Sequence, residues 1–138
     1  TDMAVKGDSK TNAIAHAVCN AAADLEAKCI VAFTESGSTA RAVSSRRPGK
    51  MIVGATPSEK TFHRLTMSWG VIPCLVGRPE SGTSLYMQAV RGAVLAMDVQ
   101  VGDIIIVTAG MPVGRVSYTN TMRVMQVTED FINLAFEE

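Results

Sequence analysis

Small and hydroxyl-bearing residues fill the turn Thr34-Glu35-Ser36-Gly37-Ser38-Thr39, which joins a short apolar stretch to a helical pattern. Backbone N–H groups at the start of a helix are unpaired and carry partial positive charge, so they attract phosphate. Gly37 permits close approach of a ligand to the backbone. Hydroxyls supply further donors, here on Thr34, Ser36, Ser38 and Thr39. The turn is a candidate phosphate-binding site, although capping of the helix by Ser36 or Ser38 explains the same residues.

The loop from Met111 to Asn120 is a second candidate, because long loops in compact domains are often functional. It follows the most hydrophobic strand-like run of the chain, residues 104–107, and contains glycine, proline and one cation, Arg115. Arg115 either binds an anion or is a solvated loop charge. In open α/β sheets, ligands bind beyond the carboxyl ends of the strands, where both candidates are expected.

Residues arranged for catalysis or metal binding are missing from the sequence. The chain contains no dinucleotide-binding glycine motif, no P-loop and no nucleophile elbow. His16 and His63 lie inside predicted helices, and Glu35 is the only carboxylate of the candidate turn, a poor start for acid–base chemistry. The three cysteines, Cys19, Cys29 and Cys74, have no metal-ligand spacing. Two of them lie in strand-like apolar runs and are predicted to be core thiols of a cytoplasmic protein. We predict neither a catalytic centre nor a metal site.

The charges are balanced, with 13 basic and 13 acidic residues among 138. The chain therefore lacks the positive field that attracts nucleic acid or an anionic membrane. Its composition, 47% hydrophobic and 19% charged, is ordinary for a packed α/β protein. The longest apolar run is much too short to cross a bilayer. We predict no nucleic-acid partner and no membrane partner.

Helical and strand-like segments alternate along the chain. Helical spacing of apolar residues starts near 12, 39, 57 and 85, and apolar runs of strand length occupy 29–33, 51–55, 71–76, 104–107 and 121–127. The clearest helix start is Thr56, predicted as N-cap, with Pro57 first in the helix and Glu59 completing a capping box. We expect that helix to run to Trp69 and to stop at Gly70.

Alternating strands and helices imply right-handed βαβ crossovers and a mostly parallel sheet covered on both faces. No helix separates the last two strands, so the fifth is expected to be antiparallel. Pro73 favours a place near a sheet edge for the third strand. The predicted fold is an α/β, three-layer α/β/α sandwich with a five-stranded sheet. Residues 10–128 form the domain, 1–9 a linker or arm, and 129–138 a tail of unassigned role that can form a short helix.

Five stretches together resemble the C-terminal domain of pyruvate kinases, with matching order and spacing from Asn12 to Thr128. They are Ala32 to Arg41, Ala55 to Thr61, Trp69 to Pro73, Gly102 to Gly110 and Thr119 to Val124. Each stretch alone is a weak signal, but the combination is highly specific. The resemblance implies the same five-stranded sheet with a reversed last strand.

The resemblance also implies a regulatory role. The turn Thr34, Glu35, Ser36, Gly37, Ser38 and Thr39 would bind the phosphate of a sugar phosphate or nucleotide effector. A loop containing Gly110, Gly114, Arg115 and Ser117 would close over the rest of the ligand. In the family, phosphoryl transfer from phosphoenolpyruvate to ADP, with magnesium and usually potassium, takes place in a separate barrel domain. This domain is then expected to need no cofactor of its own and to be non-catalytic alone.

Two departures from the family pattern concern the effector. Relatives regulated by fructose 1,6-bisphosphate hold the second phosphate with an arginine before the fourth helix, where this chain has a segment of different length, 77–83. Ser38 stands where many relatives have a larger, often basic residue. Both departures favour a monophosphate such as ribose 5-phosphate or AMP.

The last strand, 121–127, is expected at a sheet edge, because no crossover precedes it. It carries one charge, Arg123, and no proline, so it is poorly protected against pairing with another strand. We predict a homo-oligomer through this strand; the alternative is that the tail, at Phe131 to Leu134, folds back and covers the edge. For the chain as a whole, we predict a domain that is partnered by a pyruvate kinase barrel. The alternative is a free-standing module that binds a phosphosugar or a nucleotide.

Overall fold

Apolar segments of five or six residues form one five-stranded sheet in the computed structural model, which describes residues 9–110 and 118–137. The strands are β1 (Cys29–Phe33), β2 (Ile52–Thr56), β3 (Val71–Leu75), β4 (Ile104–Ala109) and β5 (Thr121–Gln126), in the spatial order β3-β2-β1-β4-β5. Neighbouring strands are parallel except β4 and β5, which are antiparallel. The predicted sheet with a reversed last strand is confirmed.

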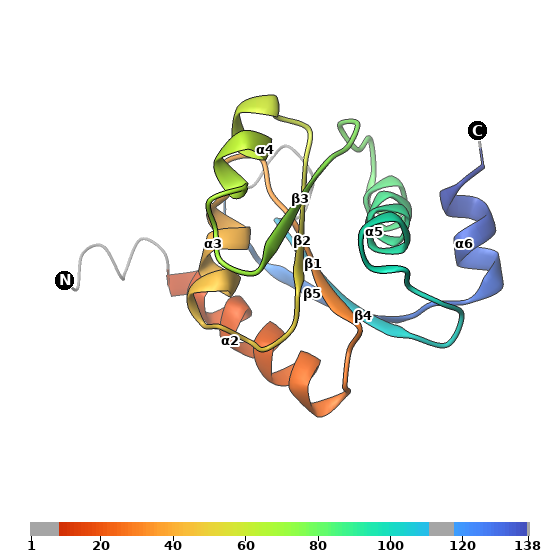
Figure 1. The fold of residues 1–138 in the computed structure, drawn as a ribbon, viewed down its shortest axis with the longest axis horizontal. Coiled ribbons are helices and arrows are strands. Elements are labelled where there is room, and N and C mark those ends of the chain that lie inside the picture. The colour runs from red at the N-terminus through yellow and green to blue at the C-terminus, as the bar shows by residue number, and fades with distance from the viewer. Residues whose placement is uncertain (1–8, 111–117, 138) are drawn as a thin grey trace.

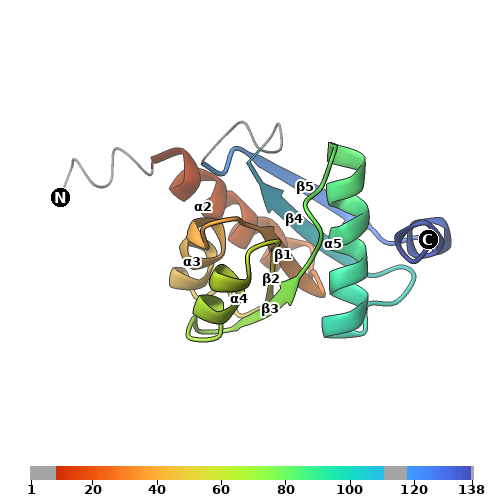
Figure 2. The ribbon, with the colours of Figure 1, turned by 90° about the horizontal axis from the view of Figure 1, so that it is seen from above.

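Helices cover both faces of the sheet (Figures 1 and 2). On one face lie α2 (Ser9–Asp24), α3 (Ser38–Ser45) and α4 (Glu59–Leu65), and on the other lie α5 (Gly82–Met97) and α6 (Glu129–Ala135). The predicted three-layer α/β/α arrangement is thus confirmed. Within the described residues, no helix has the length and apolar character needed to span a membrane.

Two apolar layers hold the sheet between its helices. Successive residues of a strand point to opposite faces. Ile30 and Ile52 accordingly pack in the layer beneath α2, α3 and α4, whereas Val31 and Val53 pack in the layer beneath α5. β1 and β2 are buried along their whole length, in keeping with sequences that are apolar except for Thr56 at the end of β2. The turns that follow β1 and β2 are therefore attached to rigid, well-packed strands.

The predicted N-cap of α4 is wrong. Thr56 is the last residue of β2, and its carbonyl accepts a hydrogen bond from the N–H of Val76 at 2.9 Å. Ser58 is the N-cap instead, with its Oγ accepting from the N–H of Thr61 at 3.2 Å. Pairing with β3 thus keeps Thr56 in the sheet and moves the helix start two residues along the chain.

The predicted end of α4 is also wrong, because the helix stops at Leu65 rather than at Trp69. Leu65 is the last buried residue of α4, whereas Met67 is 89% exposed and Trp69 is 55% exposed. Residues after Leu65 therefore gain little apolar burial from staying helical. Gly70 has a φ of 68° in the turn that leads into β3.

The two edges of the sheet are β3 and β5, as predicted. Pro73 lies in β3, where one side of the strand has no neighbour in the sheet. The tail forms α6, which packs against α5 rather than along β5 (Figure 2). Val124 of β5 remains 45% exposed.

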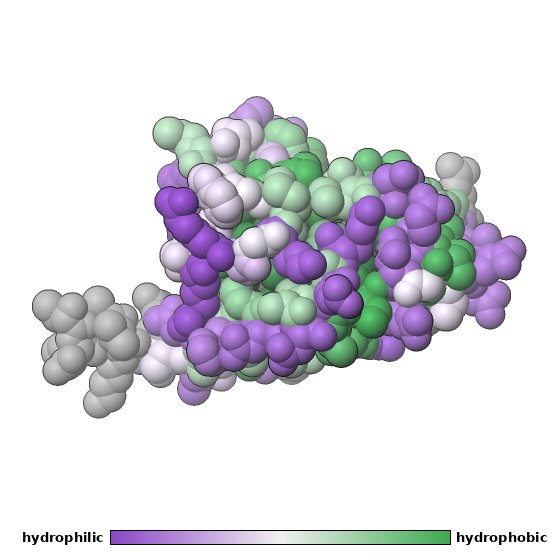
Figure 3. Space-filling view, turned by 60° about the horizontal axis from the view of Figure 1, so that its bottom comes forward, coloured by the Kyte–Doolittle hydropathy of each residue, from purple (hydrophilic) through white to green (hydrophobic). Residues whose placement is uncertain are grey.

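Polar and apolar residues are interspersed over the face of the molecule in Figure 3. The exposed large apolar side chains are distributed over several elements, including Met67 before β3, Leu95 in α5 and Leu134 in α6. Single exposed apolar residues of this kind are normal on the surface of a folded domain. These scattered residues do not mark a binding site, whereas the polar contacts of the turn 34–39 form a candidate one.

Candidate functional site

The turn after β1 is folded tightly upon itself. Thr34 is 4% exposed, and its Oγ1 accepts a hydrogen bond from the N–H of Gly37 at 2.7 Å. Gly37 has a φ of 94°, which favours glycine, and a Cβ there would stand 2.5 Å from Nη1 of Arg41. Glycine is therefore favoured by the backbone conformation, and a larger residue there would displace the end of the Arg41 side chain.

Gly37 is the N-cap of α3, and it makes no side-chain capping hydrogen bond. The Oγ of Ser36 accepts from the N–H of Ser38 at 3.3 Å, which accounts for one helical donor. Within residues 9–110 and 118–137, the backbone N–H groups of Thr39 and Ala40 have no acceptor. Capping by a serine is thus an incomplete explanation of the turn, because two adjacent donors are left for another partner.

The hydroxyl of Thr39 has a structural role. Its Oγ1 lies 2.5 Å from Oγ1 of Thr119, and both residues are nearly fully buried. The N–H of Thr119 donates to Oγ1 of Thr11 at 3.1 Å. These contacts fasten the segment before β5 to the starts of α2 and α3. Thr39 can therefore offer a ligand its backbone N–H more readily than its hydroxyl.

The predicted effector loop is only partly described. Gly110 directly follows β4. Gly114, Arg115 and Ser117 lie outside the described residues. Because Thr119 contacts Thr39, the chain re-enters the described region beside the candidate turn.

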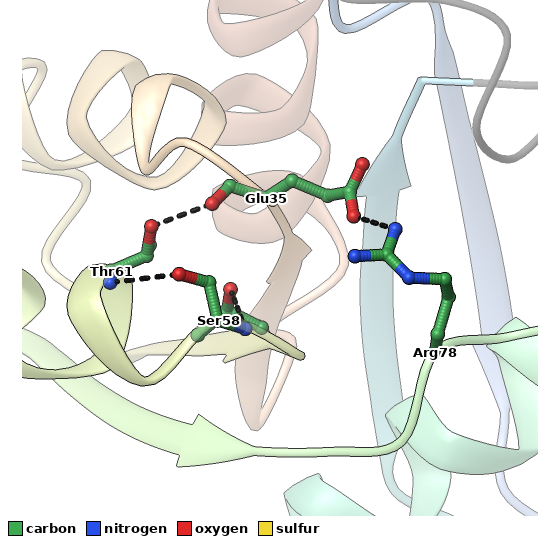
Figure 4. A network of polar contacts seen from close by, with 5 residues as sticks. Glu35, Ser58, Thr61 and Arg78 are labelled. Atoms are coloured by element: carbon green, nitrogen blue, oxygen red, sulfur yellow. Dashed lines mark hydrogen bonds and ion pairs between the residues drawn. The ribbon is translucent and has the colours of Figure 1, made fainter.

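Glu35 connects the turn to two other elements (Figure 4). Its backbone carbonyl accepts from Oγ1 of Thr61 in α4 at 2.6 Å. Its carboxylate points the other way and forms an ion pair with the guanidinium of Arg78, in the connection between β3 and α5. Arg78 was not predicted as a site residue, because the length of the segment 77–83 departs from the family pattern. The signal in its favour is that Arg78 is the only cation in this segment, which follows the carboxyl end of a parallel strand.

Two cations therefore lie close to the turn. Arg78 contacts Glu35, and Arg41 donates from Nη1 to the carbonyl of Ser36 at 3.2 Å. A surface hollow of about 280 Å³ adjoins Arg41 and Ser38. A larger hollow of about 450 Å³ lies between the end of β3, α5 and α6, and none of the turn residues line it. The chemistry that suits a phosphate is at the turn rather than in the larger hollow.

The histidines and cysteines lie in other surroundings. His16 is exposed on α2, where it contacts Asn20 and Arg46. Burial raises the pKa of the Cys29 thiol to about 12, which leaves it protonated and unreactive. In the part of the chain that the structure describes, no three His, Cys, Asp or Glu residues are grouped to hold a metal ion.

The chain matches the family model described as "Pyruvate kinase, alpha/beta domain" over residues 12–125. It is 44% identical over 127 residues to a pyruvate kinase of Clostridium acetobutylicum, which covers 90% of this chain and 27% of that protein. It is 42% identical over 125 residues to pyruvate kinases of Staphylococcus aureus strains USA300 and NCTC 8325, covering 91% of this chain and 21% of theirs. The chain thus spans about a fifth to a quarter of the length of these relatives. Because the match covers the sheet and the candidate turn together, we conclude that the chain belongs to the family of pyruvate kinase alpha/beta domains.

Proposed function

We propose that this chain is the C-terminal regulatory domain of a pyruvate kinase, and that it binds a phosphorylated effector at residues 34–39. The observation that carries the proposal is the start of α3, where two N–H groups have no acceptor in the described chain. The turn before them contacts two cations, Arg41 at the Ser36 carbonyl and Arg78 at the Glu35 carboxylate. The parent enzyme would transfer a phosphoryl group from phosphoenolpyruvate to ADP in glycolysis, in the cytoplasm. Its catalytic barrel would use magnesium and potassium, while this domain would add regulation and subunit contacts.

Several features of the turn suit a phosphate. The N–H groups of Thr39 and Ala40 lie at the positive end of the α3 dipole. A hydrogen bond to a charged group contributes about 1.5–3 kcal/mol, so even two such bonds give measurable affinity. Ser36 is exposed and Ser38 is half-buried, and the Ser36 hydroxyl donates to the Ser38 hydroxyl at 3.1 Å, which leaves the Ser38 hydroxyl as a further donor. Gly110, Gly114, Arg115 and Ser117 would then cover the remainder of the ligand.

A ligand with a single phosphate group suits this turn best. Ser38 offers a small hydroxyl rather than a cation, and Arg78 is the one cation in the segment 77–83. The positive charge available to a second phosphate is therefore limited. Ribose 5-phosphate and AMP are the compounds to test first.

Effector binding predicts a thermal shift of the 138-residue chain. A ligand that binds only the folded state at one hundred times its Kd adds about 2.7 kcal/mol of stability. Ribose 5-phosphate or AMP should therefore raise Tm by several degrees, and fructose 1,6-bisphosphate should raise it less. Ribose and adenosine are the matched controls and should leave Tm unchanged. Equal shifts with and without the phosphate group, or no shift with any phosphate, would contradict the proposal.

We further propose that β5 pairs with β5 of a second copy. The N–H of Val127 donates to the carbonyl of Asp103 in the antiparallel pair of β4 and β5. Bonded and non-bonded residues alternate along such a pair, so Val124, three residues away, directs its N–H away from β4. Val124 is 45% exposed and Met122 is 37% exposed, which leaves this edge partly apolar. A two-fold partner would satisfy the open edge.

Val124→Pro should shift a dimer towards monomer in sedimentation. Proline removes an outward N–H from each copy, so two intersubunit bonds are lost and the bonds between β4 and β5 remain. At about 0.5–1.5 kcal/mol per bond, the dimer Kd should rise about tenfold to a hundredfold. Val124→Thr keeps the N–H and should sediment like the parent chain. A parent chain that is monomeric at high concentration would rule out this interface.

A further inference from the structure

The ion pair of Glu35 with Arg78 is the only one between side chains within residues 9–110 and 118–137. It joins the candidate turn to the connection between β3 and α5, 43 residues further along the chain. A resident carboxylate inside an anion-binding turn is unexpected, because it repels the ligand that the turn attracts. The ion pair with Arg78 indicates a role for the Glu35 carboxylate in this turn.

The backbone of Glu35 is held in place independently of its side chain. Oγ1 of Thr61 donates to the Glu35 carbonyl at 2.6 Å, and Thr61 is 4% exposed. The N–H of Thr61 is in turn bound by the N-cap Ser58. Figure 4 shows the carboxylate directed away from this anchor and towards Arg78. The carboxylate can therefore release Arg78 while the turn keeps its shape.

The ion pair itself is easily exchanged. The Arg78 side chain is 64% exposed and the Glu35 side chain is 46% exposed. Ion pairs at such exposed sites are weak, since water and salt screen both charges. A phosphate carries close to two negative charges and offers three oxygens, so it is the stronger partner for a guanidinium.

We propose that a phosphate bound at the turn takes Arg78 from Glu35, so that the Glu35 carboxylate acts as a built-in competitor of the ligand. This inference rests on the proposed effector function. It identifies Glu35 as a residue that lowers the affinity of that site for phosphate. Singly charged anions displace the carboxylate poorly, and the site therefore selects doubly charged phosphates. Because Arg78 lies three residues before Ser81, the N-cap of α5, the exchange also links ligand binding to the start of α5.

Glu35→Gln tests the exchange by calorimetric titration of the 138-residue chain with AMP and with ribose 5-phosphate at low salt. The amide keeps the length of the side chain and the backbone contact with Thr61 but removes the competing charge. Kd should fall about threefold to tenfold, and the gain should shrink as salt is raised. Arg78→Gln should weaken binding. Glu59→Gln, the matched control, removes the same charge from the exposed first turn of α4 and should change Kd less than twofold.

The double variant Glu35→Gln with Arg78→Gln separates competition from simple repulsion. If Glu35 competes for Arg78, the gain from Glu35→Gln should largely disappear once Arg78 is gone. An equal gain in both backgrounds would overturn the exchange, because Glu35 would then act by repulsion alone. Phosphate binding that Glu35→Gln leaves unchanged or weakens would overturn it as well, while the effector site would stand. No phosphate binding by the parent chain or by Glu35→Gln would refute the effector site and the exchange together.

Discussion

Ser36→Asp should weaken the binding of ribose 5-phosphate and AMP at least a hundredfold, which corresponds to about 2.7 kcal/mol. The Ser36 hydroxyl already accepts from the N–H of Ser38 at 3.3 Å, so a carboxylate there lies beside the start of α3. It would compete for the helix donors and repel the phosphate at short range. An acidic residue near a helix N-terminus is favourable for the helix, so the fold should remain intact. Calorimetric titration measures the loss, and circular dichroism checks the fold.

Two control variants separate charge from shape and position in this experiment. Ser36→Asn has nearly the same size as the aspartate but no charge, and it should lose much less affinity than Ser36→Asp. Ser45→Asp adds the same charge at the other end of α3, where it is exposed, and binding should change little. If Ser36→Asp binds both phosphates as tightly as the parent chain, then the turn is only the start of a helix.

Leu65→Ala should lower the free energy of unfolding by about 2–5 kcal/mol. Leu65 is fully buried between α4 and the sheet, and it is one of only two buried residues in this seven-residue helix. The truncation leaves a cavity that the short helix fills poorly. Because α4 holds the carbonyl of Glu35 through Thr61, the variant should also bind phosphates less tightly. Urea denaturation gives the stability loss, and titration at low temperature gives the change in affinity.

Met67→Ala is the matched control for Leu65→Ala. Met67 is also a long apolar residue, two positions along the chain, but it is 89% exposed. Its truncation creates no cavity and should change the free energy of unfolding by less than about 0.5 kcal/mol. Similar losses from the two substitutions would mean that α4 is not anchored through Leu65.

The order of strands and helices could be predicted because each strand has a strong local signal. β1 and β4 are runs of apolar residues of strand length, and the helical patterns between them impose parallel crossovers. Pro73 marked an edge strand for a similarly local reason, since proline has no N–H to donate. The turn 34–39 was recognisable as well, because its small and hydroxyl-bearing residues directly follow a buried strand.

The cap of α4 depended on a longer-range contact. Thr56, Pro57 and Glu59 form a valid capping box in the sequence alone. Whether Thr56 caps the helix or stays in the sheet depends on its pairing with β3, which begins fifteen residues later at Val71. A local pattern contains no information about that pairing.

The amino-acid sequence by itself determined the α/β class, the reversed last strand and the position of a candidate anion-binding turn, because periodicity and turn chemistry act over a few residues. The tertiary structure alone decided which distant side chains meet that turn. Arg78 reaches Glu35 across 43 residues, and Thr119 reaches the hydroxyl of Thr39 across 80. Such contacts depend on how parallel strands align their carboxyl ends, and that alignment is set by the packing of the whole sheet.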